Sequence, residues 1–310
     1  MNSYQPRVSI LMNCHNGERY LEEALQSILS QTYPYWNLVF WDNQSTDRSA
    51  EIVKSFEDSR IKYLLSTEFT SLGKARSLAW PYLTGDLIAF LDADDVWRAN
   101  KLEKQVPYFE DQEIGLVISN TEFFNDAVSR PLFTTKYPQS GYVFDRLILD
   151  YFISLETLVL RRKAIEDLPY AFDQDFSFIA DFDVCLRVAD NWKLSYVPEV
   201  LGGWRVHNSS DSWKSPISFA DEKIKWIEKQ SHLNPSLVKR REDSFSKLVV
   251  QTHQVAAMYQ IADRKRKLAL DHIRKAGLLN LKTVILLLFA FMPGGGKFIR
   301  LREKNKINLR

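Results

Sequence analysis

The chain has 310 residues, 45% hydrophobic and 26% charged, which is the composition of a globular protein with one large domain or two smaller ones. Cys14 and Cys185 lie far apart and no CxxC occurs, which excludes a disulfide framework and a CxxC zinc site and predicts reduced thiols in a cytosolic protein. The N-terminus MNSYQPRVSI has no basic region followed by a long apolar stretch, so no signal peptide is expected.

The net charge of +2 hides an asymmetry along the chain. Residues 262–310 carry 13 Lys and Arg against 3 Asp and Glu, a net of +10, and residues 1–261 carry 28 against 36, a net of −8. An acidic body with a basic tail predicts a contact with an anionic surface. We expect that surface to be a membrane and expect no nucleic-acid partner.

Strand and helix patterns alternate four times in the first hundred residues. Short apolar runs predict buried strands, and apolar residues at helical spacing predict amphipathic helices. The strands are expected at 8–12, 38–41, 61–65 and 87–91, and the helices at 21–29, 45–56 and 72–82. This alternation predicts an α/β fold with a mostly parallel sheet flanked by helices.

Polar residues follow three of these strands. Asn13 ends the first strand, Asp42 and Asn43 end the second, and DADD at 92–95 ends the fourth. Ligands of open α/β sheets bind at the carboxyl ends of the strands. The three polar groups are therefore expected to form one shared site.

The pattern becomes less regular after Lys101. Further helices are expected at 102–109 and 181–189, further strands at 116–119 and 194–198, and residues 120–145 are expected to be rich in loops. Residues 218–276 have a helical pattern with a break near Asn234-Pro235.

The last fifty residues contain an apolar run. Residues 283–292 (TVILLLFAFM) carry no charge and lie between Lys282 and Lys297. A membrane span needs about 20 apolar residues, so this run is too short to cross a bilayer. It predicts an interfacial membrane helix whose basic flanks meet anionic headgroups, and the alternative is a helix packed on the main domain with a solvated basic tail.

The segment IAFLDADDVW, residues 88–97, places three carboxylates directly after an apolar strand. Mg²⁺ and Mn²⁺ take oxygen ligands and commonly share them with substrate phosphates. Asp92 and Asp94 point the same way if the segment is extended, so both can reach one bound group, whereas Asp95 points elsewhere.

Six motifs resemble, in order and spacing, the family 2 glycosyltransferases of GT-A fold. They are VSILMNCHNGERYLEEALQSILSQTY, LVFWDNQSTDRSAEIV, LGKARSLAW, GDLIAFLDADDVWRANKLEKQ, DFDVCLRVA and GGWRVHNSS. The resemblance is dense over 7–106 and continues at 181–189 and 202–210. It implies transfer of a sugar from a nucleotide-diphosphate donor to an acceptor hydroxyl, with inversion and a divalent metal.

The same resemblance assigns the donor-binding residues. It places Asp42 at the nucleobase, with Asn43 where a second Asp is common, and Asn13 lining the base pocket through its backbone. Arg76 corresponds to an arginine near the nucleotide, assisted by Lys74. Asp92 and Ala93 belong to the donor site near the ribose, and Arg205 is expected at the diphosphate.

The metal and the catalytic base follow from the same motifs. Asp94 is expected to bind Mn²⁺ or Mg²⁺, with Asp92, Asp95 and His207 as further candidates. Asp95 has the alternative of holding its neighbours in place. Asp181 corresponds to the base, although Ala180 stands where the family usually has Glu, and Asp183 is the alternative base.

Structural roles remain open for several of these side chains. An aspartate at a strand end closes a turn, and one at a helix start caps the helix. These alternatives apply to Asp42 and Asp181. Lys74 and Arg76 have the alternative of exposed, solvated helix charges, and His207 that of a structural histidine. Core or interface packing is the alternative to sugar stacking for Trp97, Trp204 and Trp213.

We therefore expect a catalytic domain at 1–215, with a nucleotide-sugar half at 1–106 and an acceptor half at 107–215, and a helical region at 216–310. The expected donor is a UDP-sugar. The expected acceptor is a glycan or lipid-linked hydroxyl in bacterial polysaccharide, lipopolysaccharide or glycolipid assembly, at the inner face of the cell membrane. The alternatives are an inactive membrane-associated sugar-nucleotide-binding protein and a phosphatase of the haloacid dehalogenase type.

Overall fold

The computed structural model of the chain describes residues 4–207, 216–278, 280–292, 296 and 299. The chain divides into two compact units, which are described separately. The first comprises Met1–Phe144 and Tyr151–His207, and the second comprises Asp145–Asp150 and Asn208–Arg310.

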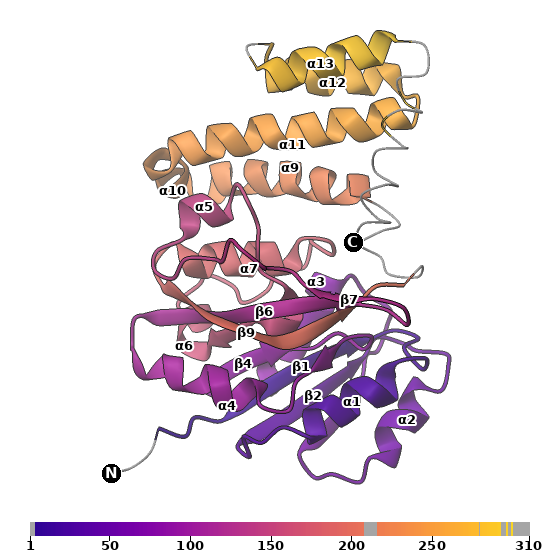
Figure 1. Cartoon of the computed structure of the whole chain (residues 1–310), viewed down its shortest axis with the longest axis vertical. Coiled ribbons are helices and arrows are strands. Elements are labelled where there is room, and N and C mark those ends of the chain that lie inside the picture. The colour runs from indigo at the N-terminus through magenta and orange to yellow at the C-terminus, as the bar shows by residue number, and fades with distance from the viewer. Residues whose placement is uncertain (1–3, 208–215, 279, 293–295, 297–298, 300–310) are drawn as a thin grey trace. The chain divides into compact units, whose positions relative to one another are not determined.

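The first unit is built on one sheet, with nine strands in its described part (Figure 1). The strand order is β3-β2-β1-β4-β8-β6-β9-β5, and β7 pairs with β6. The strands are β1 Val8–Cys14, β2 Trp36–Asp42, β3 Ile61–Leu65, β4 Leu87–Phe90, β5 Val96–Trp97, β6 Ile114–Phe124, β7 Ser129–Pro131, β8 Val159–Arg161 and β9 Lys193–Arg205. The first four pair in parallel, as the α/β alternation predicts, and β8 runs antiparallel to both β4 and β6.

Helices flank this sheet. The α-helices are α1 Leu21–Leu29, α2 Ser49–Ser55, α3 Leu72–Ala79, α4 Lys101–Gln105, α6 Arg162–Glu166 and α7 Ala180–Ala189. The short helix α5 Phe144–Leu147 begins in this unit with Phe144, and its other three residues belong to the second unit. Short 3-10 turns are η1 Trp80–Tyr82, η2 Val106–Glu110 and η3 Leu155–Thr157. The expected helices at 72–82 and 102–109 therefore each end in a 3-10 turn, where Pro81 and Pro107 lie at the first positions of the tighter turn.

Alternation along the strands fixes which residues meet the helices. Ile10 and Met12 of β1 and Phe40 of β2 lie in one buried cluster with Leu25 of α1 and Leu102 of α4. Successive strand residues point to opposite faces, so these apolar residues share one side of the sheet. This packing holds the carboxyl ends of β1, β2 and β4 at one edge.

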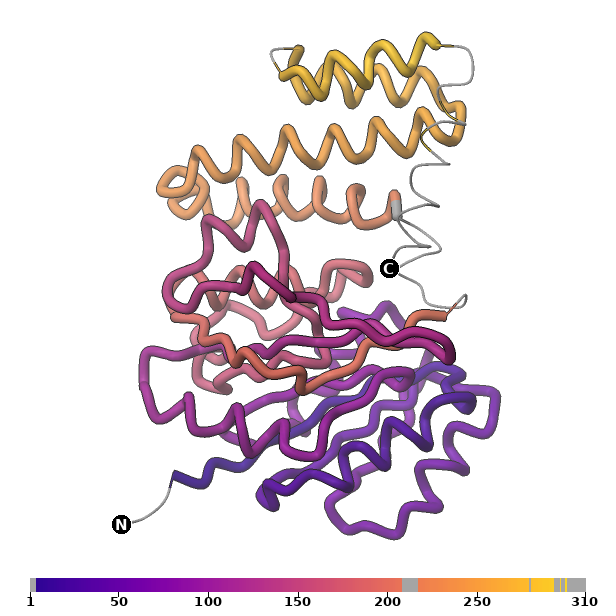
Figure 2. The backbone as a smooth tube through the Cα atoms, in the orientation of Figure 1, coloured from indigo at the N-terminus to yellow at the C-terminus, as the bar shows by residue number. Residues whose placement is uncertain are grey.

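Residues 120–145 were expected to be loop-rich, and that expectation is wrong for their first part. β6 continues to Phe124 and pairs in parallel with β9, which is 13 residues long rather than the expected five (Figure 2). The pairing shifts register at Ser119/Asn120 and Asn120/Thr121. Such irregularities interrupt the simple alternation on which a sequence pattern depends.

The second unit is helical in its described part. Its helices are α9 Pro216–Leu233, α10 Pro235–Arg240, α11 Glu242–Ala262, α12 Arg266–Ala276 and α13 Leu281–Phe291. The break at Asn234-Pro235 is confirmed. The pattern did not predict two further breaks, one at Arg241 between α10 and α11 and one after Ala262, where Arg264 has a φ of 61°. Within the described residues, no helix combines the length and the apolar character needed for a membrane crossing.

Candidate active site

The three aspartates after β4 have different environments. Asp94 is partly exposed, with 37% of its side chain accessible, whereas Asp95 is buried at 4%. The Asp95 amide donates to the Asp92 carbonyl at 3.1 Å, which closes a tight turn. This turn directs the carboxylates of Asp94 and Asp95 to different surroundings.

Asp94, just before β5, meets a residue that follows β9, the strand paired with β5. Its Oδ2 lies 2.9 Å from Nε2 of His207, and the His207 ring packs on Tyr20 with centroids 5.0 Å apart. The two residues are 113 positions apart in sequence, and the end of β9 brings them together. The structure thus brings together two of the four residues that the resemblance offers as metal ligands.

Arg205 holds this part of the site together. Its side-chain Nε donates to the Asp94 carbonyl at 2.9 Å, and its backbone amide donates to Asp95 Oδ1 at 2.8 Å. Its guanidinium pairs with Glu23 at 2.5 Å and lies over the rings of Tyr20 and Phe124. The side chain is nearly buried and occupied by protein partners, a position suited to fixing the DADD turn.

Asp95 is buried beside the end of β9. Its carboxylate accepts from the Arg205 amide and is buried close to Glu156. Burial, and next the charge of Glu156, raise the pKa of Asp95 well above its usual range. The position fits a residue that holds its neighbours in place.

Glu156 is a site-adjacent residue that the sequence pattern did not single out. It is 2% exposed and accepts from Ser154 and Thr121. Beside it, Lys101 is fully buried, with Nζ 4.2 Å from the Trp97 ring centroid, and burial lowers the pKa of Lys101 to about 7. A sequence pattern normally assigns charged residues such as Glu156 and Lys101 to the surface. Only the fold shows that both are buried.

Asp92 lies among several charges. Burial raises its pKa to about 7, the Arg76 cation opposes this rise, and the charges of Asp94, Glu156 and Asp181 add to it. Arg76 is 3% exposed, and its Nε is buried without a hydrogen-bond partner among the described residues. Arg76 is therefore a buried cation beside the aspartates and not a solvated helix charge.

Asp181 occupies the first turn of α7, where negative charge is favoured by the helix dipole. The N-cap position is Ile179, so Asp181 does not cap the helix. Its Oδ2 accepts a hydrogen bond from Tyr151 Oη at 2.9 Å. Asp183 is fully buried and paired with Arg187 at 2.6 Å, so Asp181 is the member of this pair available to a substrate.

The nucleobase candidates lie on neighbouring strands, with Cys14 of β1 paired to Asp42 of β2. Asp42 is 1% exposed, and its two oxygens accept from the Ser45 amide and from Tyr63 Oη, both at 2.7 Å. The contact with the Ser45 amide closes a turn at the end of β2. Asn13 is partly buried, and its Nδ2 has no hydrogen-bond partner within the described part of the chain.

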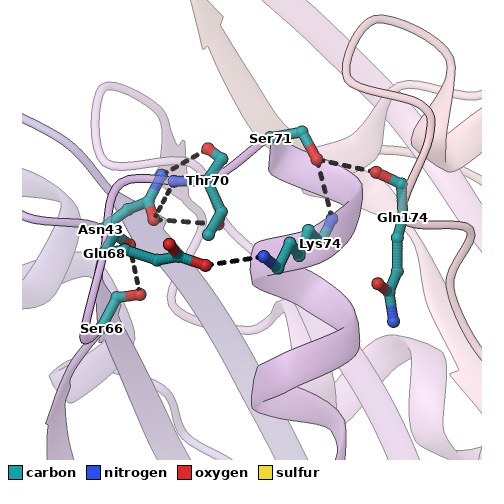
Figure 3. A network of polar contacts seen from close by, with 7 residues as sticks. All are labelled: Asn43, Ser66, Glu68, Thr70, Ser71, Lys74 and Gln174. Atoms are coloured by element: carbon teal, nitrogen blue, oxygen red, sulfur yellow. Dashed lines mark hydrogen bonds and ion pairs between the residues drawn. The ribbon is translucent and has the colours of Figure 1, made fainter.

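Asn43 and Lys74 belong to a separate polar network around the start of α3 (Figure 3). Asn43 Nδ2 donates to the Thr70 carbonyl at 2.9 Å, and Lys74 pairs with Glu68 at 2.7 Å. Ser71 caps α3 by accepting from the Lys74 amide at 3.2 Å. The network shapes the segment that precedes α3, and it does not join the Asp92–Asp94 group.

The tryptophans have mainly packing roles. Trp97 is 4% exposed and donates from Nε1 to the Glu156 carbonyl at 2.7 Å. Trp204 packs on Phe123 with ring centroids 5.1 Å apart. Trp213 lies outside the described residues. Ala93, next to the metal candidates, is partly buried between Asp92 and Asp94.

The Asp94–His207 pair has the donor atoms that a divalent cation needs. A carboxylate oxygen and an imidazole nitrogen face each other at 2.9 Å, and Mg²⁺ and Mn²⁺ take further ligands from substrate phosphates and water. Among the described residues, no group of three or more His, Cys, Asp or Glu side chains is arranged to hold a metal ion. The residues thus fit a cation that protein and substrate hold jointly.

The curled sheet, its helices and this edge define a GT-A glycosyltransferase fold. Residues 1–349 of Staphylococcus aureus TarS, solved with UDP-GlcNAc, match with a TM-score of 0.60 at 16% identity, over 87% of this chain and 88% of that one. The mannosyltransferase PcManGT from Pyrobaculum calidifontis, solved with GDP-Man and Mn²⁺, matches with a TM-score of 0.63 at 18% identity, over 97% of this chain and 85% of that one. Both likenesses confirm the expected fold.

The sequence profile described as "Glycosyl transferase family 2" matches residues 9–168. The chain therefore belongs to glycosyl transferase family 2, and the predicted family is confirmed. A relative from Escherichia coli, named UDP-Glc:alpha-D-GlcNAc-diphosphoundecaprenol beta-1,3-glucosyltransferase WfgD, is 34% identical over 165 residues. That match covers 53% of this chain and 64% of the relative, a little under two thirds of its length.

Proposed function

We propose that the chain transfers a sugar from a nucleotide-diphosphate donor to an acceptor hydroxyl, with inversion at the anomeric carbon. The observation that carries this proposal is the convergence of Arg76, Asp94 and Asp181 on Asp92, which brings three separate motifs to one edge of the sheet. Family membership supplies the reaction class.

The proposed donor is a UDP-sugar, bound by residues 1–106 as the nucleotide-sugar half. WfgD is named for UDP-Glc and TarS was solved with UDP-GlcNAc, which supports UDP, whereas PcManGT was solved with GDP-Man. Asp42 and Asn13 are proposed to line the base pocket, with Asn43 and Lys74 shaping its rim. A buried cation such as Arg76 favours an anionic ligand beside it.

In the proposed mechanism, Asp181 accepts the proton of the acceptor hydroxyl as the oxygen attacks the anomeric carbon. Tyr151 occupies one carboxylate oxygen of Asp181, and the other oxygen serves as the base. Arg76 and the 107–215 half, which we propose as the acceptor side, orient the reactants. Attack from the side opposite the leaving diphosphate gives inversion.

Asp94 and His207 are proposed to hold Mn²⁺ or Mg²⁺, with Asp92 beside them. When bound, the cation neutralises charge that develops on the leaving diphosphate. Arg205 keeps the Asp94 turn in place through the Asp94 carbonyl, rather than contacting the diphosphate.

The proposed acceptor is a lipid-linked glycan hydroxyl in bacterial cell-envelope polysaccharide or glycolipid assembly. WfgD is named for a diphosphoundecaprenol-linked acceptor. Such an acceptor lies at a membrane surface, so we propose a peripheral contact with anionic lipid at the cytoplasmic face. The +10 charge of residues 262–310 supports this contact.

The test is release of nucleotide from UDP-, GDP- and dTDP-sugars with Mn²⁺ and a lipid-linked acceptor, using wild type and Asp181→Asn. We expect one donor to react and the Asn variant to lose about 100-fold or more in kcat, with donor binding retained. Asp126→Asn, at an exposed position between β6 and β7, is the matched control and keeps full activity.

Two outcomes contradict the proposal. Full activity of Asp181→Asn excludes this base. Donor binding by wild type without any transfer favours the alternative of an inactive sugar-nucleotide-binding protein.

A further inference from the structure

The helix α13 is fixed to the second unit by one of its faces. Thr283 is fully buried, and its Oγ1 accepts a hydrogen bond from Gln254 of α11 at 2.8 Å. Leu286, 6% exposed, lies in a cluster with Ile261 of α11 and Ile273 of α12. These contacts set the rotation of the helix about its axis, so its opposite face has a defined direction.

That opposite face is apolar and exposed. Its residues recur at helical spacing along the whole of α13 and just beyond its last residue, and we name this surface the α13 stripe. The stripe consists of Leu281 (75% exposed), Val284 (36%), Ile285 (42%), Leu288 (61%), Phe291 (56%) and Met292 (53%). Single exposed apolar residues are ordinary, but a contiguous row of large ones marks an interaction surface.

Basic side chains border the stripe at both ends. Lys282 is exposed beside Leu281, and the Arg266 guanidinium lies 3.8 Å from the centroid of the Phe291 ring. Exposed basic residues continue along α12 and the turn before it, at Arg264, Lys265, Lys267, Arg274 and Lys275. Of the two acidic residues between 262 and 292, Asp271 is paired with Lys275 at 2.9 Å.

The charge around the stripe identifies the partner. Two copies of the chain that met stripe to stripe would bring their basic borders against each other, because a two-fold interface apposes identical patches. The partner of the stripe must therefore offer an apolar interior to the exposed apolar residues and negative charge to their basic border. The boundary between headgroups and acyl chains of an anionic bilayer is such a surface.

The length of α13 sets its orientation. Eleven helical residues span about 16 Å, roughly half the hydrocarbon thickness of a bilayer. The stripe also runs along the helix and not across one end. We infer that α13 lies flat in the interface of an anionic membrane, with the α13 stripe inserted and with Lys282 and Arg266 at the headgroups. This inference deepens the membrane contact proposed above and rests on it.

The test uses flotation of the full chain with vesicles of phosphatidylglycerol and phosphatidylcholine. We expect wild type to float and Leu281→Gln/Leu288→Gln to lose binding on the order of tenfold or more, since two exposed leucines no longer enter the apolar layer. Leu233→Gln/Val128→Gln changes two apolar residues outside the stripe that are more than half exposed, and this control should keep wild-type binding. Circular dichroism checks that all variants are folded.

A charge variant tests the border. Arg266→Gln/Lys282→Gln is expected to lose roughly fivefold per charge on anionic vesicles and to match wild type on pure phosphatidylcholine. Equal loss on both vesicle types contradicts an electrostatic role for the border.

The outcomes separate this inference from the proposed function. If the stripe variant binds vesicles as well as wild type does, the α13 stripe is not the membrane contact, and that contact lies elsewhere on the chain. If wild type binds no vesicle, the α13 inference and the proposed membrane contact are both wrong. If wild type is a dimer in ultracentrifugation and the stripe variant is a monomer, the α13 stripe binds a second copy of the chain. Vesicle binding by a chain that transfers no sugar supports the stripe and overturns the proposed reaction.

Discussion

Tyr151 Oη donates a hydrogen bond to Asp181 Oδ2 at 2.9 Å and thereby fixes one oxygen of the proposed base. Burial, followed by the Asp181 charge, raises the pKa of Tyr151 well above its usual range, so the phenol stays protonated and remains a donor at neutral pH. The Tyr151 ring also packs on Phe182, with centroids 5.4 Å apart. Tyr151 is therefore suited to positioning the base.

Replacing Tyr151 with Phe keeps the ring and removes only the hydrogen bond. The Asp181 carboxylate then loses the contact that fixes its Oδ2, so we expect kcat to fall about tenfold with little change in KM. Tyr108→Phe, at an exposed position, should leave kcat unchanged, and an unchanged kcat in Tyr151→Phe would show that the hydrogen bond has no catalytic consequence.

Chelation should abolish transfer by wild type, and Mn²⁺ or Mg²⁺ should restore it. His207→Ala removes one of the two facing donor atoms and should raise the half-saturating metal concentration by roughly 10- to 100-fold. His232→Ala, an exposed histidine of α9, is the control and should match wild type. Metal titrations that coincide for wild type and His207→Ala would exclude His207 from the metal site.

Arg205 should matter for stability more than for nucleotide affinity. Arg205→Ala removes the bonds to the Asp94 carbonyl and to Glu23 together with packing on two rings, and should lower the free energy of unfolding by about 2–3 kcal/mol. Denaturant unfolding and UDP titration measure the two effects, with exposed Arg130→Ala as control. A large loss of UDP affinity at unchanged stability would instead place Arg205 at the diphosphate, as the sequence motif predicted.

The helical unit should lose stability in mild acid through His253 of α11 and His272 of α12. Their Nδ1 atoms lie 3.0 Å apart, and burial, then His272 and Lys275, lower the pKa of His253 to about 4. Above pH 6.5 the ring is neutral in both folded and unfolded chains. Between about pH 6.5 and 4 the unfolded chain binds a proton that the folded chain does not, so stability falls as the pH falls.

Hydrogen exchange of α11 and α12 at pH 7 and pH 5 measures this effect. Intrinsic exchange is slower at pH 5, so the rates are compared as protection factors, the ratio of the intrinsic to the observed rate. We expect lower protection factors at pH 5 than at pH 7 in wild type and a smaller difference in His253→Gln. His232→Gln changes an exposed histidine and should behave like wild type. Equal protection factors at both pH values in wild type would contradict the coupling.

The sequence predicted the parallel half of the sheet well, because each strand there is a short apolar run followed by polar residues at the same edge. It predicted less after Lys101, where register shifts between β6 and β9 break the alternation. The Asp94–His207 contact joins residues 113 positions apart, and only a family motif suggested it. Tyr151 and Glu156 carry no local signal, since their roles arise from which side chains the fold places beside them.

The irregular pairing of β6 and β9 places three extra residues in β9. From the pair Ser119–Val197 to the pair Thr121–Gly202, β6 advances by two residues and β9 by five. Regular pairing continues from Gly202 to Arg205, opposite Thr121 to Phe124, and His207 follows two residues later. Loss of the extra residues between Val197 and Gly202 would therefore leave the histidine that faces Asp94 in place, whereas each residue deleted between Gly202 and His207 would withdraw it by about 3 Å.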